Sequence, residues 1–145
     1  MNNEVMQYEG NAMTIAGELD VQNNMFCSIT GESKEDKVRI YNAISNPSNA
    51  LSDCKGEILE IKDVIAHYVQ MESMEDTGEI ITAPRIVLID KEGATYACVS
   101  TGIMQSLKQI FMLFGAPTWE DPVKVKVIEK KGRKGYKFLS LELVA

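Results

Sequence analysis

Hydrophobic residues alternate with polar ones over much of the second half of the chain, and this pattern predicts β-strands. We expect strands at residues 58–71, 80–89, 95–100, 123–129 and 136–143. The first is unusually long for a strand, so we expect it to bend near Asp63. The polar sequence DKEG separates the second strand from the third and predicts a hairpin turn.

One segment, residues 102–114, has the spacing of a helix instead. Its apolar residues recur every three or four positions and form the stripe of an amphipathic helix that packs on a core: Ile103, Met104, Leu107, Ile110, Phe111 and Phe114. Ser100 or Thr101 can cap its start, while Gly115 and Pro117 mark its end.

Three strands, a helix and two strands follow one another in the order of an OB-fold, a five-stranded barrel with its helix between strands 3 and 4. We therefore predict a mainly β, OB-fold-like barrel over residues 56–145. Residues 1–50 form an N-terminal β extension or add strands to the barrel, with candidates at residues 13–19, 25–29 and 37–43.

Length and composition support a single domain over residues 1–145, because a chain of this size with 45% hydrophobic residues can bury one core. The chain contains neither a run of about 18 apolar residues nor a cationic start followed by an apolar stretch. We expect no membrane span, no secretory signal and a cytoplasmic location, in a bacterium or a host cell. Three widely spaced cysteines predict reduced thiols and no zinc site.

The net charge of -6 is unevenly distributed along the chain. Residues 122–145 carry seven Lys or Arg against two Glu, a net charge of +5, whereas residues 1–121 carry eight against nineteen, a net charge of -11. A cationic segment in an acidic protein indicates a surface for a polyanion. The alternative is a solvated edge hairpin whose lysines prevent sheets from aggregating.

The cationic segment reads as a hairpin with a turn centred on Arg133, so that Lys130 lies opposite Tyr136. Three valines, at positions 123, 125 and 127, then pair with the leucines at 143, 141 and 139 to form an apolar face. The other face combines lysines with Ile128, Phe138 and Tyr136. The loop at residues 131–135 is a phosphate clamp or a plain flexible loop.

Aromatic rings beside cations on an open β-surface suit a single-stranded nucleic acid, because bases stack on rings while Lys and Arg neutralise phosphates. Two further tyrosines fit this interpretation. Tyr68 alternates with Ile65 and Val69, which face a core, so we expect Tyr68 to point outward. The direction of Tyr96 is ambiguous, and a core tyrosine with a satisfied hydroxyl is the alternative.

Several phrases of the sequence, in one order from Val38 to Val144, resemble the single-stranded-DNA-binding proteins of phi-29-like phages. They are VRIYNA, GEILE, IAHY, DKEG, YACVS, VKVKV and, after Gly135, FLSL. Each phrase is a short strand-like stretch, so the resemblance rests on their order and spacing.

The resemblance implies a protein that coats displaced strands during phage DNA replication, with cooperative binding, no base preference and no enzymatic activity. It also implies that Tyr68 and Tyr96 contact DNA. A third family tyrosine falls in the loop at residues 74–78, where this chain has no aromatic residue. The predicted nucleic-acid-binding residues are Tyr68, Tyr96, Lys124, Lys126, Lys130, Lys131, Arg133, Lys134, Tyr136 and Phe138.

Other functions have less support in the sequence. His67 is the only histidine, and neither a G-x-S-x-G motif nor a P-loop is present, so we expect no catalytic residues, no cofactor and no metal. The expected partners are single-stranded DNA, further copies of the chain along the strand, and replication proteins, without a membrane. The alternative function is a protein-interaction or regulatory module of the same OB-like fold that uses its acidic surface.

Overall fold

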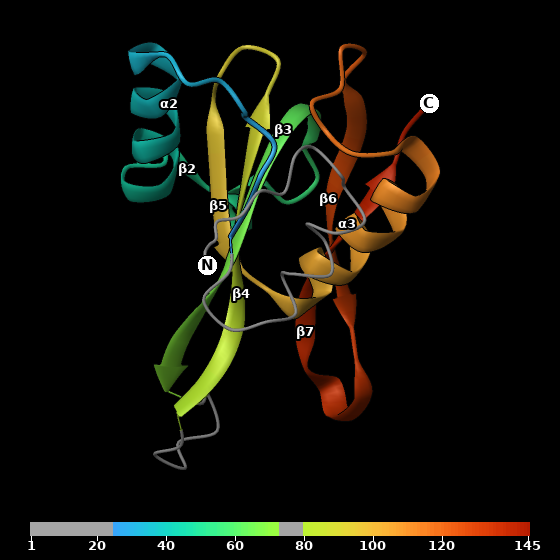
Figure 1. Ribbon diagram of the computed structural model, residues 1–145. Helices are drawn as coiled ribbons and strands as arrows, with labels where there is room; N and C mark the ends of the chain where they lie inside the picture. Colours follow the sequence, from blue (N-terminus) through green and yellow to red (C-terminus); the bar gives the residue numbers. More distant parts are fainter. Residues whose placement is uncertain (1–24, 73–79) are drawn as a thin grey trace.

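A single curled sheet is the centre of the molecule (Figure 1). The computed structural model describes residues 25–72 and 80–145. Within them, seven strands form the sheet: β1 (Met25–Cys27), β2 (Asn49–Ala50), β3 (Ile58–Glu72), β4 (Ile80–Asp90), β5 (Thr95–Val99), β6 (Val123–Lys131) and β7 (Lys137–Leu143). The order across the sheet is β2-β5-β4-β3-β6-β7, and β1 pairs with β3 beside this path.

The predicted mainly β fold and the order of its last six elements are confirmed. Helix α3 (Thr101–Phe114) lies in the sequence between β5 and β6, as expected. The sheet has seven strands and not the five of the predicted barrel, because the described part of the N-terminal region adds β1 and β2. β1 lies within the strand candidate at residues 25–29, so the alternative that this region adds strands is confirmed there. A closed OB barrel would require β5 to pair with β7. These two strands are not hydrogen-bonded neighbours in the described sheet, so the sheet is an open half-barrel.

Residues 37–43, predicted as a strand, belong instead to helix α2 (Lys34–Ser45). Ser33 caps the helix by accepting a hydrogen bond from the backbone N–H of Asp36, and acidic residues in the first turn favour the positive end of the helix dipole. Its half-buried Ile40 and Ile44 pack beside buried Ala43 on the sheet. The strand candidate at residues 13–19 lies outside the described residues.

A bulge divides β3 in two at the position of Lys62, which the pairing with β4 skips. The carbonyl of Lys62 accepts a hydrogen bond from the backbone N–H of Trp119 at 3.0 Å. Next to it, the carboxylate of Asp63 is 3% exposed and accepts hydrogen bonds from the hydroxyls of Ser28, at 2.8 Å, and Thr118. The bend expected near Asp63 is confirmed, and three segments of the chain meet there.

The buried residues form two clusters on opposite faces of the sheet. The main cluster includes Leu59 and Ile61 before the bulge and Val64 and Ala66 after it, because one extra residue reverses the alternation of side chains. Ile65 points the other way, into the second cluster under α2. One strand therefore contributes to both cores.

Helix α3 lies along β7 and closes the main cluster with the first four residues of its predicted apolar stripe. Ser100 caps its start, and Gly115, at φ 80°, ends it. A Cβ at Gly102 would lie 2.3 Å from the carbonyl oxygen of Leu139, so only glycine allows the helix to approach β7 this closely. No helix in the described part of the chain is long and apolar enough to cross a membrane.

We expect Asp63→Ala to lower the free energy of unfolding by about 2 to 3 kcal/mol, because two hydroxyl groups lose a charged acceptor in a buried site. Chemical denaturation measures this change. Asp121→Ala, at an exposed aspartate, is the matched control and is expected to change stability by less than about 0.5 kcal/mol. Equal stabilities of the two variants would show that the carboxylate does not hold the bulge.

Candidate nucleic-acid interface

β6 and β7 form an antiparallel hairpin whose tip is the 3₁₀ turn η2 (Arg133–Gly135). Lys130 lies opposite Phe138, so the prediction that it lies opposite Tyr136 is wrong by two residues. The reason is the turn, which is centred one residue later than expected, on Lys134 (φ 62°), and is followed by Gly135 (φ 81°). A turn of this shape could not be read from the alternation of the flanking strands.

The shift of two residues leaves the side chains on their predicted faces, because the faces of a strand alternate with a period of two. Val127 lies opposite Leu141, not Leu139, but is still buried in the main cluster. Phe138 on the other face is 41% exposed, and Tyr136 beside the tip is 65% exposed. The prediction that both rings face solvent is confirmed.

Six predicted cations lie on this hairpin and its tip: Lys124, Lys126, Lys130, Lys131, Arg133 and Lys134. Five are exposed, and Lys126 is half-buried. None of the six forms a salt bridge within the described ranges, whereas the hairpin's own Glu129 is bound by Lys55 at 2.9 Å. The hairpin therefore presents positive charge that neighbouring acids do not neutralise.

A series of neighbouring residues connects the strand of Tyr68 to the hairpin. Tyr68 is opposite Pro84 in β4, and the carbonyl of Pro84 accepts a hydrogen bond from the backbone N–H of Ser100 at 3.1 Å. Two residues later, a Cβ at Gly102 would lie 2.9 Å from the ring of Phe138. The first turn of α3 thus lies between the β3–β4 pair and the hairpin. The β3–β4 pair and the tip of the hairpin both extend toward the same end of the molecule (Figure 1).

The prediction that Tyr68 points away from the core is wrong. Its side chain is half-buried and packs against the main cluster, on the same face as Val64 and Ala66. The alternation counted from the start of the strand fails because the bulge at Lys62 exchanges the two faces. Tyr68 can therefore offer only part of its ring to a ligand.

Tyr96 has the environment of a core tyrosine, one of the two interpretations that the sequence left open. It is half-buried against the main cluster, and its hydroxyl donates a hydrogen bond to the carboxylate of Asp90 at 3.0 Å. Burial, followed by this hydrogen bond and the charge of Asp90, raises the pKa of Tyr96 to about 12. The β4–β5 turn beside it lies at the end of the molecule opposite the hairpin tip (Figure 1).

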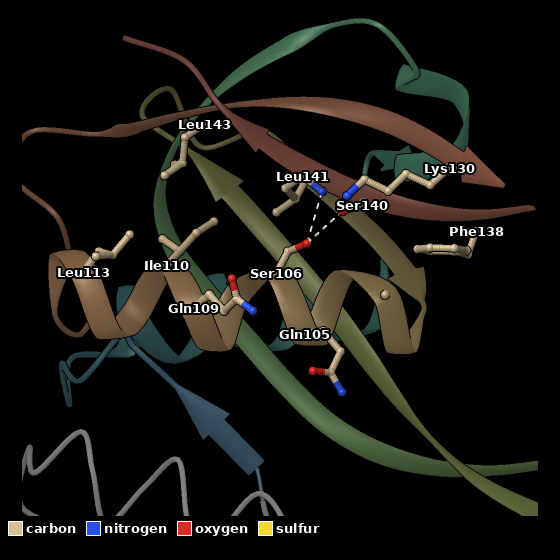
Figure 2. A pocket seen from close by; sticks show the side chains of 11 residues that line it. Gln105, Ser106, Gln109, Ile110, Leu113, Lys130, Phe138, Ser140, Leu141 and Leu143 are labelled. Atoms are coloured by element: carbon tan, nitrogen blue, oxygen red, sulfur yellow. Dashed lines mark hydrogen bonds between the residues drawn. The ribbon is translucent and has the colours of Figure 1, made fainter. Parts of the chain in front are cut away.

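A groove of about 410 Å³ between α3 and the hairpin includes two of the predicted residues, Lys130 and Phe138. Its other wall carries Gln105, Ser106 and Gln109 of α3 (Figure 2). These three residues are absent from the predicted site, because the prediction for the helix used only its apolar stripe. The spacing of Gln105 and Gln109, four residues apart, was the available signal that they share a face.

His67 has no partner for its buried Nδ1 atom among the described residues. Burial, and secondarily the nearby positive charge of Arg85, lowers the pKa of His67 below its usual value. Within residues 25–72 and 80–145, no group of three or more His, Cys, Asp or Glu side chains could hold a metal ion. The hairpin is the strongest candidate for a functional surface because its exposed rings lie beside cations that form no salt bridge within the described ranges.

A family model described as Phage Single-stranded DNA-binding protein matches residues 19–144, nearly the whole chain. No curated protein and no solved structure matches the chain.

The raised pKa of Tyr96 predicts a loss of stability in alkaline solution. Below pH 10 the phenol is neutral in both the folded and the unfolded chain; as the pH rises from 10 to about 12, only the unfolded chain loses this proton. We therefore expect the free energy of unfolding to fall more steeply over this interval in the wild type than in Tyr96→Phe, as measured by chemical denaturation. Parallel curves for the two proteins would contradict this pKa.

Proposed function

Because this chain belongs to the phage single-stranded DNA-binding protein family, we propose that it coats DNA strands displaced during replication of a phage genome, in the cytoplasm of the host cell. One observation carries the proposal. Two exposed rings, Tyr136 and Phe138, share a hairpin with cations that have no salt-bridge partner among the described residues. We propose no catalytic step for this surface.

The two kinds of side chain supply different parts of the binding energy. Each base stacked on an aromatic ring contributes about 1 to 3 kcal/mol, and every base has a face that can stack. The cations neutralise phosphates and release counterions, which makes the affinity depend on salt. Neither interaction reads a base sequence, so these two contributions to the affinity do not depend strongly on sequence.

The pairing order of the sheet supports a path for the strand. β3, β4, β5, β6 and β7 pair in the order of an open OB-fold, in which the loops between strands 1 and 2 and between strands 4 and 5 flank an oligonucleotide. The corresponding ribbons here are β3–β4 and β6–β7, with the first turn of α3 between them. We propose that DNA crosses this end of the molecule, over the hairpin and past Tyr68.

The remaining contacts follow from this path. The exposed part of Tyr68 adds a stacking surface next to the hairpin. Contact between DNA and Tyr96, which the resemblance implies, stays a prediction. It requires the bound DNA to continue to the start of β5, away from the hairpin tip. Cooperative coating requires neighbouring molecules to touch, so we propose self-association along the strand, and replication proteins as further partners.

The salt dependence of binding tests the role of the cations. We expect Lys131→Gln together with Arg133→Gln to weaken binding to an oligothymidine at low salt, because two phosphate contacts are lost. The slope of log affinity against log salt should become less steep by about 1.4, about 0.7 for each contact on a single strand. Fluorescence titration at several salt concentrations measures the slope.

The matched control is Lys34→Gln together with Lys37→Gln, which removes two exposed charges from α2, far from the hairpin tip in Figure 1. This variant is expected to keep the wild-type slope. Identical slopes for both variants would exclude the hairpin tip as a phosphate contact and would favour binding through another surface.

Truncation of one ring tests stacking. We expect Tyr136→Ala to weaken oligothymidine binding by about 1 to 3 kcal/mol without a change in thermal stability, since the side chain is 65% exposed. Tyr41→Ala is the control, because Tyr41 is also 65% exposed but belongs to α2, which lies on the other side of the molecule from the hairpin tip in Figure 1. Equal affinities of the two variants would remove Tyr136 from the interface.

A further inference from the structure

The groove between α3 and the hairpin contains polar side chains that neither phosphate neutralisation nor base stacking requires. Figure 2 shows it running from Phe138 and Lys130 at one end to Leu113 and Leu143 at the other. The walls are fixed, because the hydroxyl of Ser106 accepts a hydrogen bond from the backbone N–H of Leu141 at 3.2 Å and lies 3.1 Å from the hydroxyl of Ser140. The exposed polar side chains of the lining that take no part in these hydrogen bonds are free to meet a ligand.

Two amides on the α3 wall have this freedom. Gln105 and Gln109 are exposed, lie four residues apart on one face of the helix, and have no hydrogen-bond partner in the described part of the chain. A glutamine amide carries a donor and an acceptor side by side, which is the pattern that pairs with the edge of a nucleobase. In a single strand those base edges are not occupied by a complementary strand.

The groove also lacks the acidic side chains that are common in the rest of the chain. The chain contains 21 Asp and Glu, yet none of the residues that line the groove is acidic, and its single charge is Lys130. Phe138 supplies a ring at the same end; one edge of this ring lies close to Gly102 of α3, and the side chain is still 41% exposed. A cation, a ring and two free amides together match a nucleotide rather than an apolar peptide.

The groove has a volume of about 410 Å³, which lies in the range of sites that bind one small ligand. A groove of this size is too small to enclose a folded partner. We propose that one nucleobase of the bound strand enters this groove, with its edge toward Gln105 and Gln109, and that this contact gives the protein a base preference. This inference rests on the proposed function. The affinity still comes mainly from phosphates and stacking, and the groove adds discrimination between bases.

Oligonucleotides of deoxyadenosine, deoxycytidine and thymidine of equal length test the preference. In the wild type we expect the largest and smallest dissociation constants to differ by at least about fivefold, and Gln105→Ala with Gln109→Ala should reduce this ratio to less than about twofold. The salt slope should stay unchanged, because no cation is removed. Asn42→Ala removes an exposed amide from α2 and is the control that should keep the wild-type ratio.

Side-chain amide signals in a nuclear magnetic resonance titration provide the direct readout. Shifts of the Gln105 and Gln109 amides on addition of oligonucleotide, without a shift of Asn42, support the inference. Binding without such shifts, or an unchanged ratio in the double variant, overturns it while leaving the proposed function in place. Absence of binding to all three oligonucleotides would overturn the proposed function itself.

Discussion

The structure depends on the hydrogen bonds that hold the carboxylate of Asp63 at the bulge of β3. Ser28 and Thr118 bring two distant segments to this point, so that the strand can bend where its pairing with β4 skips Lys62. Before the bend β3 pairs with β6, and after it with β1. The bulge thereby lets one strand supply both cores and directs the β6–β7 hairpin away from the β3–β4 ribbon.

A hairpin that leaves the sheet can concentrate positive charge in an acidic protein. Its tip carries cations close together, and Glu129, which would weaken their field, is engaged by Lys55. At physiological salt the screening length is about 8 Å, so a phosphate at the tip responds to these nearby cations more than to the acidic remainder of the chain. Exposed Tyr136 and Phe138 lie within the same local field. The arrangement favours a ligand with alternating anionic and aromatic groups, as in a single nucleic-acid strand.

The features that could be predicted from the sequence are those that depend on a regular repeat of hydrophobic and polar residues. The strands after residue 57, helix α3, its Ser100 cap and the exposure of the hairpin rings could all be read from alternation, helical spacing and turn residues. The errors occur where one residue changes the period. The bulge at Lys62 turned Tyr68 toward the core, and the left-handed Lys134 moved the hairpin register. Residues 37–43 look like a strand in isolation, whereas the cap that makes them helical lies before them, and the groove requires two elements far apart in the sequence.

Binding to equal-length single-stranded DNA, duplex DNA and single-stranded RNA shows whether the hairpin recognises exposed bases or phosphate charge alone. Exposed rings can stack only on bases that are not already stacked in a duplex. We expect single-stranded DNA to be bound much more tightly than the duplex in a gel-shift or fluorescence titration at physiological salt. Equal affinity for the duplex would mean that the hairpin recognises phosphate charge alone, and the role in coating displaced strands would be contradicted.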